Sequence, residues 1–266
     1  MKNKIIIGSC SAVLGIVLLT GGVFTASAQV GTAASSSRIA ARAAAEAQRL
    51  QNIVNRADQE ITRRINALNA LSTRVNAMQK VSADQKSSLS SSIQTQISAM
   101  NSLQAKIAGD ANSTTSLKAD VQSITGSYRI FALIIPQGAI EAAADRVMTI
   151  ASDMTTIGTK LQTRVTALGS SASGAVTSAL ADFNAKIADA NTQARAAVTE
   201  VSGLMPDQGV QAQMQANTAA LKDARSKIQA AEKDLVAARS DAATIVKALI
   251  QNGASATTTP VAPSSQ

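Results

Sequence analysis

The residues best suited to chemistry are two carboxylates, Glu141 and Asp145, which are four positions apart. On a helix they would share one face, where paired carboxylates can hold a divalent cation or act as acid and base. A metal site needs more ligands, and the sequence has no His and no second carboxylate cluster nearby. We therefore favour ordinary ion pairing of Asp145 with Arg146 or Arg129.

Other enzymatic chemistry lacks its usual residues. The chain has no His and a single Cys, at position 10, so a serine nucleophile would need a lysine base, and no Ser-x-x-Lys motif stands out. The sequence also has no glycine-rich phosphate loop and no calcium loop. We therefore expect a protein that is not an enzyme and has no catalytic, cofactor-binding or metal-binding residues.

Four arginines, Arg42, Arg49, Arg56 and Arg63, recur at intervals of seven. On a helix they would form one line, with about 10 Å between successive members. This line is a candidate contact for an anionic polymer such as teichoic acid, anionic lipid or extracellular nucleic acid. The alternative is a solvated face that contacts nothing. No aromatic residue interleaves the arginines, so sequence-specific nucleic-acid binding is not expected.

An apolar segment from Tyr128 to Ile135 is the second candidate site. Eight residues are too few to span a bilayer as a helix, although they could contact a membrane peripherally. We favour a core plug at a turn near Pro136, because large side chains are what an alanine-rich core otherwise lacks. The residues concerned, as membrane contact or plug, are Tyr128, Ile130, Phe131, Leu133, Ile134 and Ile135.

Residues 1–28 have the layout of a secretory signal peptide. Lys2 and Lys4 precede an apolar run over residues 5–23, and Ala26-Ser27-Ala28 forms a small-residue cleavage site. Cleavage near Ala28 would place the protein outside the cell or in its envelope. The alternative is that the run stays uncleaved as an anchor. Because the only cysteine lies inside this run, the cleaved chain would contain no disulfide.

The remaining chain predicts an all-α fold. Between residues 38 and 252, apolar residues recur at alternating steps of three and four, which is the pattern of amphipathic helices. The two longest helices, of about 44 residues, would extend roughly 65 Å. We therefore expect an elongated, mainly antiparallel, coiled-coil-like bundle. Its six helices would cover about residues 37–81, 82–109, 113–135, 137–169, 173–204 and 210–253.

Local signals set the ends of these helices. A capping box at Ser82 predicts a new N-terminus, and Gly109 and Gly169 are candidate left-handed caps. Pro136 should stop or kink a helix, and residues 206–209 form a turn. Residues 29–37 are expected to be a flexible spacer, and residues 253–266 a disordered Ser/Thr/Pro tail.

Three segments carry a resemblance: residues 117–124, residues 127–137 (SYRIFALIIPQ) and residues 142–146 (AAADR). With the signal peptide, the stretch from about Arg74 to Arg146 is similar to uncharacterised exported α-helical proteins of candidate-phyla (Patescibacteria-like) bacteria. The resemblance implies a bacterial cell-surface or secreted setting. It brings no activity, cofactor or binding residue with it.

Together, these features predict a non-enzymatic structural or interaction module of a bacterial cell surface or envelope. Its partner would be an unidentified protein or an anionic surface polymer, and the helical seams could also support self-association. The alternative function is that of a membrane-active helical protein that uses the segment Tyr128–Ile135.

Overall fold

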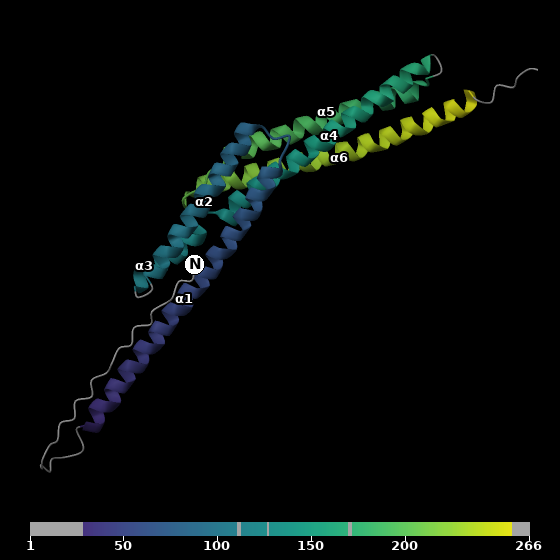
Figure 1. Ribbon diagram of the computed structural model, residues 1–266. Coiled ribbons are helices and arrows are strands. Elements are labelled where there is room, and N and C mark those ends of the chain that lie inside the picture. Colours follow the sequence, from purple (N-terminus) through teal and green to yellow (C-terminus); the bar gives the residue numbers. More distant parts are fainter. Residues whose placement is uncertain (1–28, 111–112, 127, 170–171, 257–266) are drawn as a thin grey trace, which may run out of the picture. The chain divides into compact units, whose positions relative to one another are not determined.

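The computed structural model describes residues 29–110, 113–126, 128–169 and 172–256, and within these ranges it contains helices and no strand (Figure 1). The predicted all-α class is therefore confirmed. The elements are α1 (Gln29–Ala77), α2 (Ala83–Gly109), α3 (Thr114–Gly126), the π-helix η1 (Ile130–Ile134), α4 (Ile135–Ala167), α5 (Gly174–Val201) and α6 (Gln211–Ala256). The predicted signal peptide and residues 257–266 of the predicted tail lie outside the described residues.

The chain divides into two compact units, residues 1–48 and residues 49–266. In the first unit, α1 begins at Gln29, so the predicted flexible spacer at residues 29–37 is helical instead. This segment contains no proline and leads directly into the helical sequence that follows, so the helix can extend back through it by one hydrogen bond per residue. At the other end of the chain, α6 continues to Ala256, three residues beyond the predicted helix end at Gly253.

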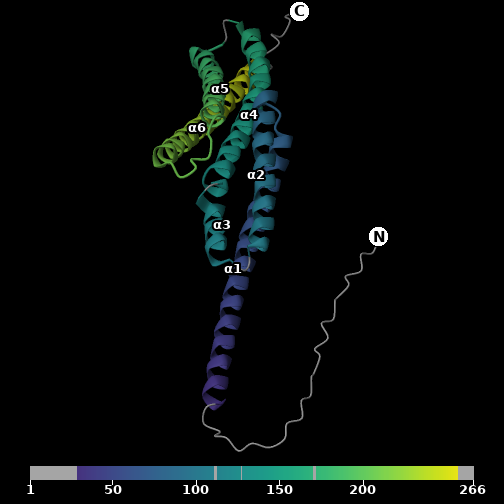
Figure 2. The same ribbon diagram turned by 90° about the vertical axis from the view of Figure 1, so that its left-hand side faces the viewer.

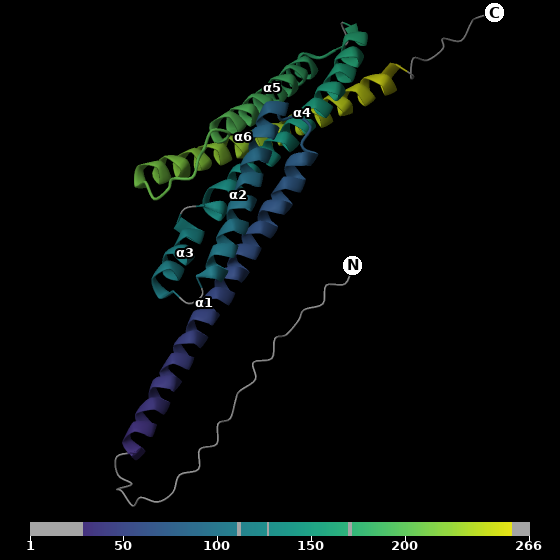
Figure 3. The ribbon, with the colours of Figure 1, turned by 60° about the vertical axis from the view of Figure 1, so that its left-hand side comes forward.

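In the second unit, α1 and α2 form an antiparallel pair (Figure 2). Near one end of the pair, the side-chain amide of Gln104 lies 2.5 Å from a carboxylate oxygen of Asp58. Near the other end, the Lys86 ammonium donates to the backbone carbonyl of Asn76 at 2.8 Å. Residue numbers fall along α2 as they rise along α1, which defines opposite directions. The shorter α3 lies beside α2 (Figure 3), where Lys106 pairs with Asp120.

Helices α5 and α6 are also antiparallel, and alanine lines the seam between them. The amide of Gln193 donates to Asp234 at 2.9 Å, and Lys227 pairs with Glu200 farther along. Small side chains let two helix axes approach more closely than leucine would. The fully buried alanines of this seam are Ala190, Ala194 and Ala197 on α5 and Ala224, Ala231 and Ala238 on α6.

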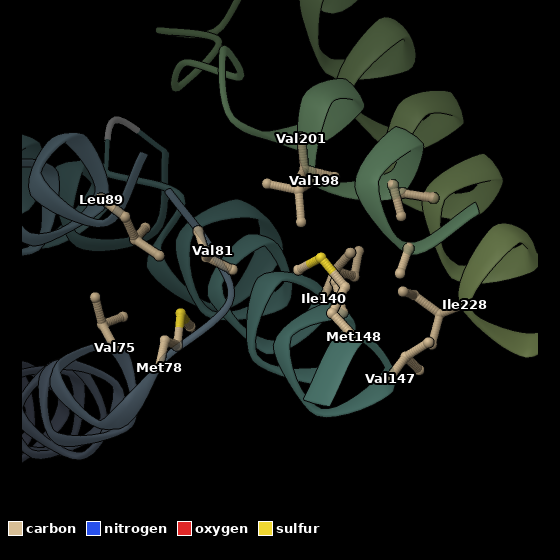
Figure 4. Packing of buried hydrophobic residues seen from close by; sticks show 14 of the residues in the cluster. Val75, Met78, Val81, Leu89, Ile140, Val147, Met148, Val198, Val201 and Ile228 are labelled. Carbon is tan, nitrogen blue, oxygen red and sulfur yellow. The ribbon is translucent and has the colours of Figure 1, made fainter. Parts of the chain in front are cut away.

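Helix α4 packs against both pairs. Figure 4 shows Val75, Met78 and Val81 on one side of α4, and Val198, Val201 and Ile228 on the other. Gly138 allows the first of these contacts, because a Cβ there would lie only 2.5 Å from Cδ1 of Leu71. One hydrophobic core thus runs through the second unit, and buried residues of α4 contribute to it on both sides.

Several predicted helix boundaries are confirmed, but the third helix, predicted to extend to residue 135, ends at Gly126. Ser82 caps α2 by accepting a hydrogen bond from the backbone N–H of Gln85 at 3.3 Å, and Gly169 has a left-handed φ of 53° just after α4. The left-handed cap predicted at Gly109 is wrong. There the chain leaves α2 through Asp110, at φ −89°, because the Asp110 carbonyl accepts from Ser113 in a right-handed turn.

Pro136 begins a helix rather than stopping one. It lies in the first turn of α4, which continues directly from η1, and the break in the chain precedes η1 at Arg129, whose φ is 47°. Proline lacks an N–H and crowds the carbonyl four residues earlier. The wider π-helical turn relieves this conflict, and in it the N–H of Ile135 donates to the carbonyl of Ile130, five residues before it.

Candidate functional site

The four arginines at intervals of seven all lie exposed on α1, with Arg42 in the first unit and the other three in the second. Arg63 differs from the rest. Its guanidinium is 2.8 Å from the carboxylate of Glu60 and 4.6 Å from the ring centre of Phe131. No ion pair between described residues involves Arg49 or Arg56, which remain available to an external anion.

Arg64, which interrupts the apolar seam of α1, is itself buried. It pairs with Glu60, and its guanidinium lies 5.0 Å from the ring centre of Phe131. Hydrogen bonds from Arg63 and Arg64 lower the pKa of Glu60. Phe131 therefore holds two arginines by cation–π contact, and this local cluster ties η1 to α1.

The apolar segment Tyr128–Ile135 lies mostly inside the second unit. Ile130, Leu133 and Ile134 are buried, Tyr128 and Ile135 are half-buried, and Phe131 is 37% exposed. A membrane contact through the three buried side chains would require the surrounding helices to separate first. None of the described helices combines the length and apolar character needed to cross a bilayer.

Arg129 does not pair with Asp145, contrary to one of the two pairings expected. Its Nε lies 2.9 Å from Oδ2 of the buried Asp207, in the turn between α5 and α6. The backbone N–H of Gly209 and then the Arg129 guanidinium lower the pKa of Asp207. This ion pair connects the start of η1 to the α5–α6 turn, at a residue whose backbone is left-handed.

Asp145 binds backbone rather than an arginine. Its Oδ1 accepts hydrogen bonds from three consecutive amides, those of Gln79 at 2.8 Å, Lys80 at 2.5 Å and Val81 at 3.0 Å. These amides belong to the connection between α1 and α2, outside both helices, and the carboxylate gives their N–H groups a hydrogen-bond acceptor. Asp145 is thus a structural clasp between α4 and the α1–α2 connection.

Glu141 is only 1% exposed, and neither of its carboxyl oxygens has a hydrogen-bond partner among the described residues. Burial raises its pKa to about 7, and the amide of Gln137, one turn earlier, only partly opposes this. Within the described part of the chain, no three His, Cys, Asp or Glu side chains gather as metal ligands. The two carboxylates thus share a helix but build no common site.

An open groove lies between α4 and α6. Its central hollow, of about 480 Å³, has the fully buried ring of Phe183 among its walls. A hollow of about 300 Å³ continues it toward Pro136, and one of about 400 Å³ continues it toward Ile250. The central hollow is lined mainly by Val147, Ile150, Met154 and Ile157 of α4 and by Leu235, Val236 and Ala242 of α6. We call this feature the α4/α6 groove.

Large aliphatic side chains along the groove are open to solvent. Their exposed fractions are 41% for Ile150, 47% for Ile157, 70% for Val236, 44% for Val246 and 66% for Ile250. A single exposed aliphatic residue needs no explanation. Five of them beside one continuous groove form an apolar patch of the kind that marks an interaction site.

The charged residues beside the groove are almost all basic. Only one carboxylate, that of Glu232, lines the three hollows, and no ion pair within the described chain involves it or the basic residues. The basic residues are Arg146, Lys160, Arg164, Arg225 and Arg239, all of them exposed. The apolar floor therefore has an unneutralised positive rim.

The groove was not predicted from the sequence. Ile140, Val147 and Leu161 form the buried apolar seam of α4, whereas Ile150 and Ile157 lie beside it and are exposed. Their spacing of seven was the available signal, since it defines a second apolar stripe on the same helix. No protein-family model, no curated protein and no solved structure matches this chain.

Proposed function

We propose that this protein is a non-enzymatic, exported interaction module of a bacterial cell surface or envelope, and that it binds a protein partner in the α4/α6 groove. The observation that carries this proposal is the line of five exposed aliphatic side chains along one hollowed face. Export is supported by the layout of residues 1–28, and the bacterial setting by the resemblance in residues 74–146.

The shape of the groove favours a polypeptide over a small molecule. Small-molecule pockets enclose most of their ligand and place a few polar groups to orient it. Here the hollows follow one another between two helices, and their walls are mostly aliphatic. Covering exposed aliphatic surface stabilises a complex by about 25 cal/mol for each Å² removed from water.

Site-specific photo-crosslinking in the source cells tests this proposal. A photoreactive residue at Val236 or Ile157 should give a discrete protein adduct. Met205 supplies the matched control, because it is as exposed as Val236, at 70%, and lies in the α5–α6 turn outside the hollows. Adducts of equal yield at all three positions, or none from the groove, would contradict the proposal.

Export has its own test. Mass spectrometry of the protein recovered from the envelope or medium should show an N-terminus at Gln29, directly after the predicted cleavage site. Recovery of the intact chain in the cytoplasm alone would count against the exported setting, while leaving the groove open to the crosslinking test.

A further inference from the structure

We propose that the segment bound in the α4/α6 groove is an acidic amphipathic α-helix of another protein, which packs as a fourth helix beside α4, α5 and α6. This inference rests on the proposed function, since it specifies the partner of the same groove. Three observations support it: the course of the groove, the spacing of its aliphatic side chains and the charge of its rim.

The groove has the dimensions of a helix. Its hollows place Pro136 near Arg225 and Arg164 near Ile250, so α4 and α6 run in the same direction along it. The 28 residue steps from Pro136 to Arg164 correspond to about 42 Å of α-helix. A partner helix of about 28 residues would therefore contact the groove along its full length.

The exposed aliphatic residues have the spacing that helix packing uses. Ile150 and Ile157 are one heptad apart on α4, and Val246 and Ile250 are one turn apart on α6. An apolar stripe on a facing helix, with residues at steps of three and four, would insert between these two rows. The pattern is that of a helical bundle with one position unfilled.

The positive charge of the groove rim favours an acidic partner helix. Five exposed basic residues and one carboxylate line the hollows, and ion pairs within the described chain leave them unneutralised. A helix that flanks its apolar stripe with Glu or Asp would complement this rim, and each exposed ion pair would tighten binding by about twofold.

The same charge disfavours a second copy of the chain as occupant. In a twofold-symmetric pair the two rims would face each other, and basic residues would meet basic residues. A lipid surface would match the charge, but it is flat on this scale. It would leave the central hollow of about 480 Å³ unfilled, whereas helix side chains would occupy it.

The probe is a synthetic 28-residue helix with Leu along one stripe and Glu flanking it, labelled for fluorescence anisotropy. Its controls are the same peptide with Lys in place of Glu, and a scrambled peptide of unchanged composition. With the full chain at about 50 mM salt, the Glu peptide should bind at least about tenfold more tightly than the Lys peptide. The difference should shrink as salt is raised, because ions screen exposed pairs.

Protein variants locate the binding site. Replacing Arg146 and Arg239 by Glu would leave three basic and three acidic residues on the rim, so the preference for the Glu peptide should disappear, whereas Arg195→Glu on α5, outside the hollows, should leave it unchanged. Replacing Ile150 and Ile157 by Ser should weaken the Glu peptide about tenfold or more. These side chains are already solvent-exposed, so the variants should retain the helical circular dichroism of the parent protein.

Several outcomes would overturn the inference. Equal binding of the Glu and Lys peptides, preference for the Lys or scrambled peptide, or no peptide binding would each do so. Flotation with phosphatidylglycerol vesicles that the Ile150→Ser/Ile157→Ser variant abolishes, without peptide binding, would assign the face to lipid. A concentration-dependent dimer lost in the same variant would assign it to a second copy. If the photo-crosslinks at Val236 form in cells but none of the peptides binds, the acidic helix is rejected and the proposed function stands.

Discussion

Replacing Glu141 by Gln should stabilise the protein in neutral and alkaline solution. The carboxyl group is buried without a hydrogen-bond partner among the described residues, and burial raises its pKa to about 7 from an ordinary value of 4.5. Each pKa unit corresponds to about 1.4 kcal/mol, so charging Glu141 in the folded state costs about 3 kcal/mol. Glutamine has nearly the same shape and carries no charge.

The direction of the pH dependence follows from proton binding. Below pH 4.5 both the folded and the unfolded chain hold this proton, and Glu141 imposes no electrostatic cost. Between about pH 4.5 and 7 the unfolded chain releases the proton while the folded chain keeps it, so the free energy of unfolding falls as pH rises. Above pH 7 both states are ionised, and the full cost of about 3 kcal/mol remains.

Urea denaturation followed by circular dichroism measures this effect in the parent protein and in Glu141→Gln between pH 4.5 and 8.5. The free energy of unfolding of the variant, relative to the parent, should increase by about 3 kcal/mol across this range. Asp153→Asn, at an exposed position of the same helix, is the matched control and should show no comparable trend. A constant difference between Glu141→Gln and the parent at every pH would refute the reasoning.

Two further substitutions test the contacts of α4. Asp145→Ala removes the acceptor of three backbone amides, so we expect a loss of about 3 kcal/mol and faster hydrogen exchange at Lys80 and Val81; unchanged exchange there would contradict the clasp. Gly158→Ala would place a Cβ 2.8 Å from the ring of Phe183, so we expect destabilisation of about 1–3 kcal/mol despite the better helix propensity of Ala. Thermal melting tests this, with Gly126→Ala, which has open space around it, as the control; a higher melting temperature for Gly158→Ala would contradict the packing.

Helix boundaries were predictable where local chemistry sets them. Ser82 and Ser173 cap helices because a serine hydroxyl accepts from the amides just after it, and residues 206–209 turn because they combine Pro, Asp and Gly. The effect of Pro136 was not predictable in this way. Proline disfavours the α-helical turn before it. Whether the helix ends there or widens into a π-helical turn depends on the contacts of the carbonyl four residues before the proline.

The candidate site required knowledge of which helices are neighbours. The stripe of Ile150 and Ile157 can be read from the sequence, but a stripe alone does not say whether another helix covers it. The roles of Glu141 and Asp145 show the same limit, since their spacing places them on one helix and says nothing of their surroundings. Asp145 reaches backbone amides of a distant connection, whereas Glu141 is enclosed and its carboxyl oxygens have no hydrogen-bond partner among the described residues.

The contribution of α4 to both sides of one hydrophobic core has a thermodynamic consequence. A helix that contributes to two packing layers cannot leave one of them without exposing apolar surface of the other, so we expect the layers of the second unit to unfold in a single transition. A ligand held in the α4/α6 groove would therefore lower the population of open states for the whole unit. Binding should therefore slow amide hydrogen exchange at Lys80 and Val81, although the ligand does not contact these residues.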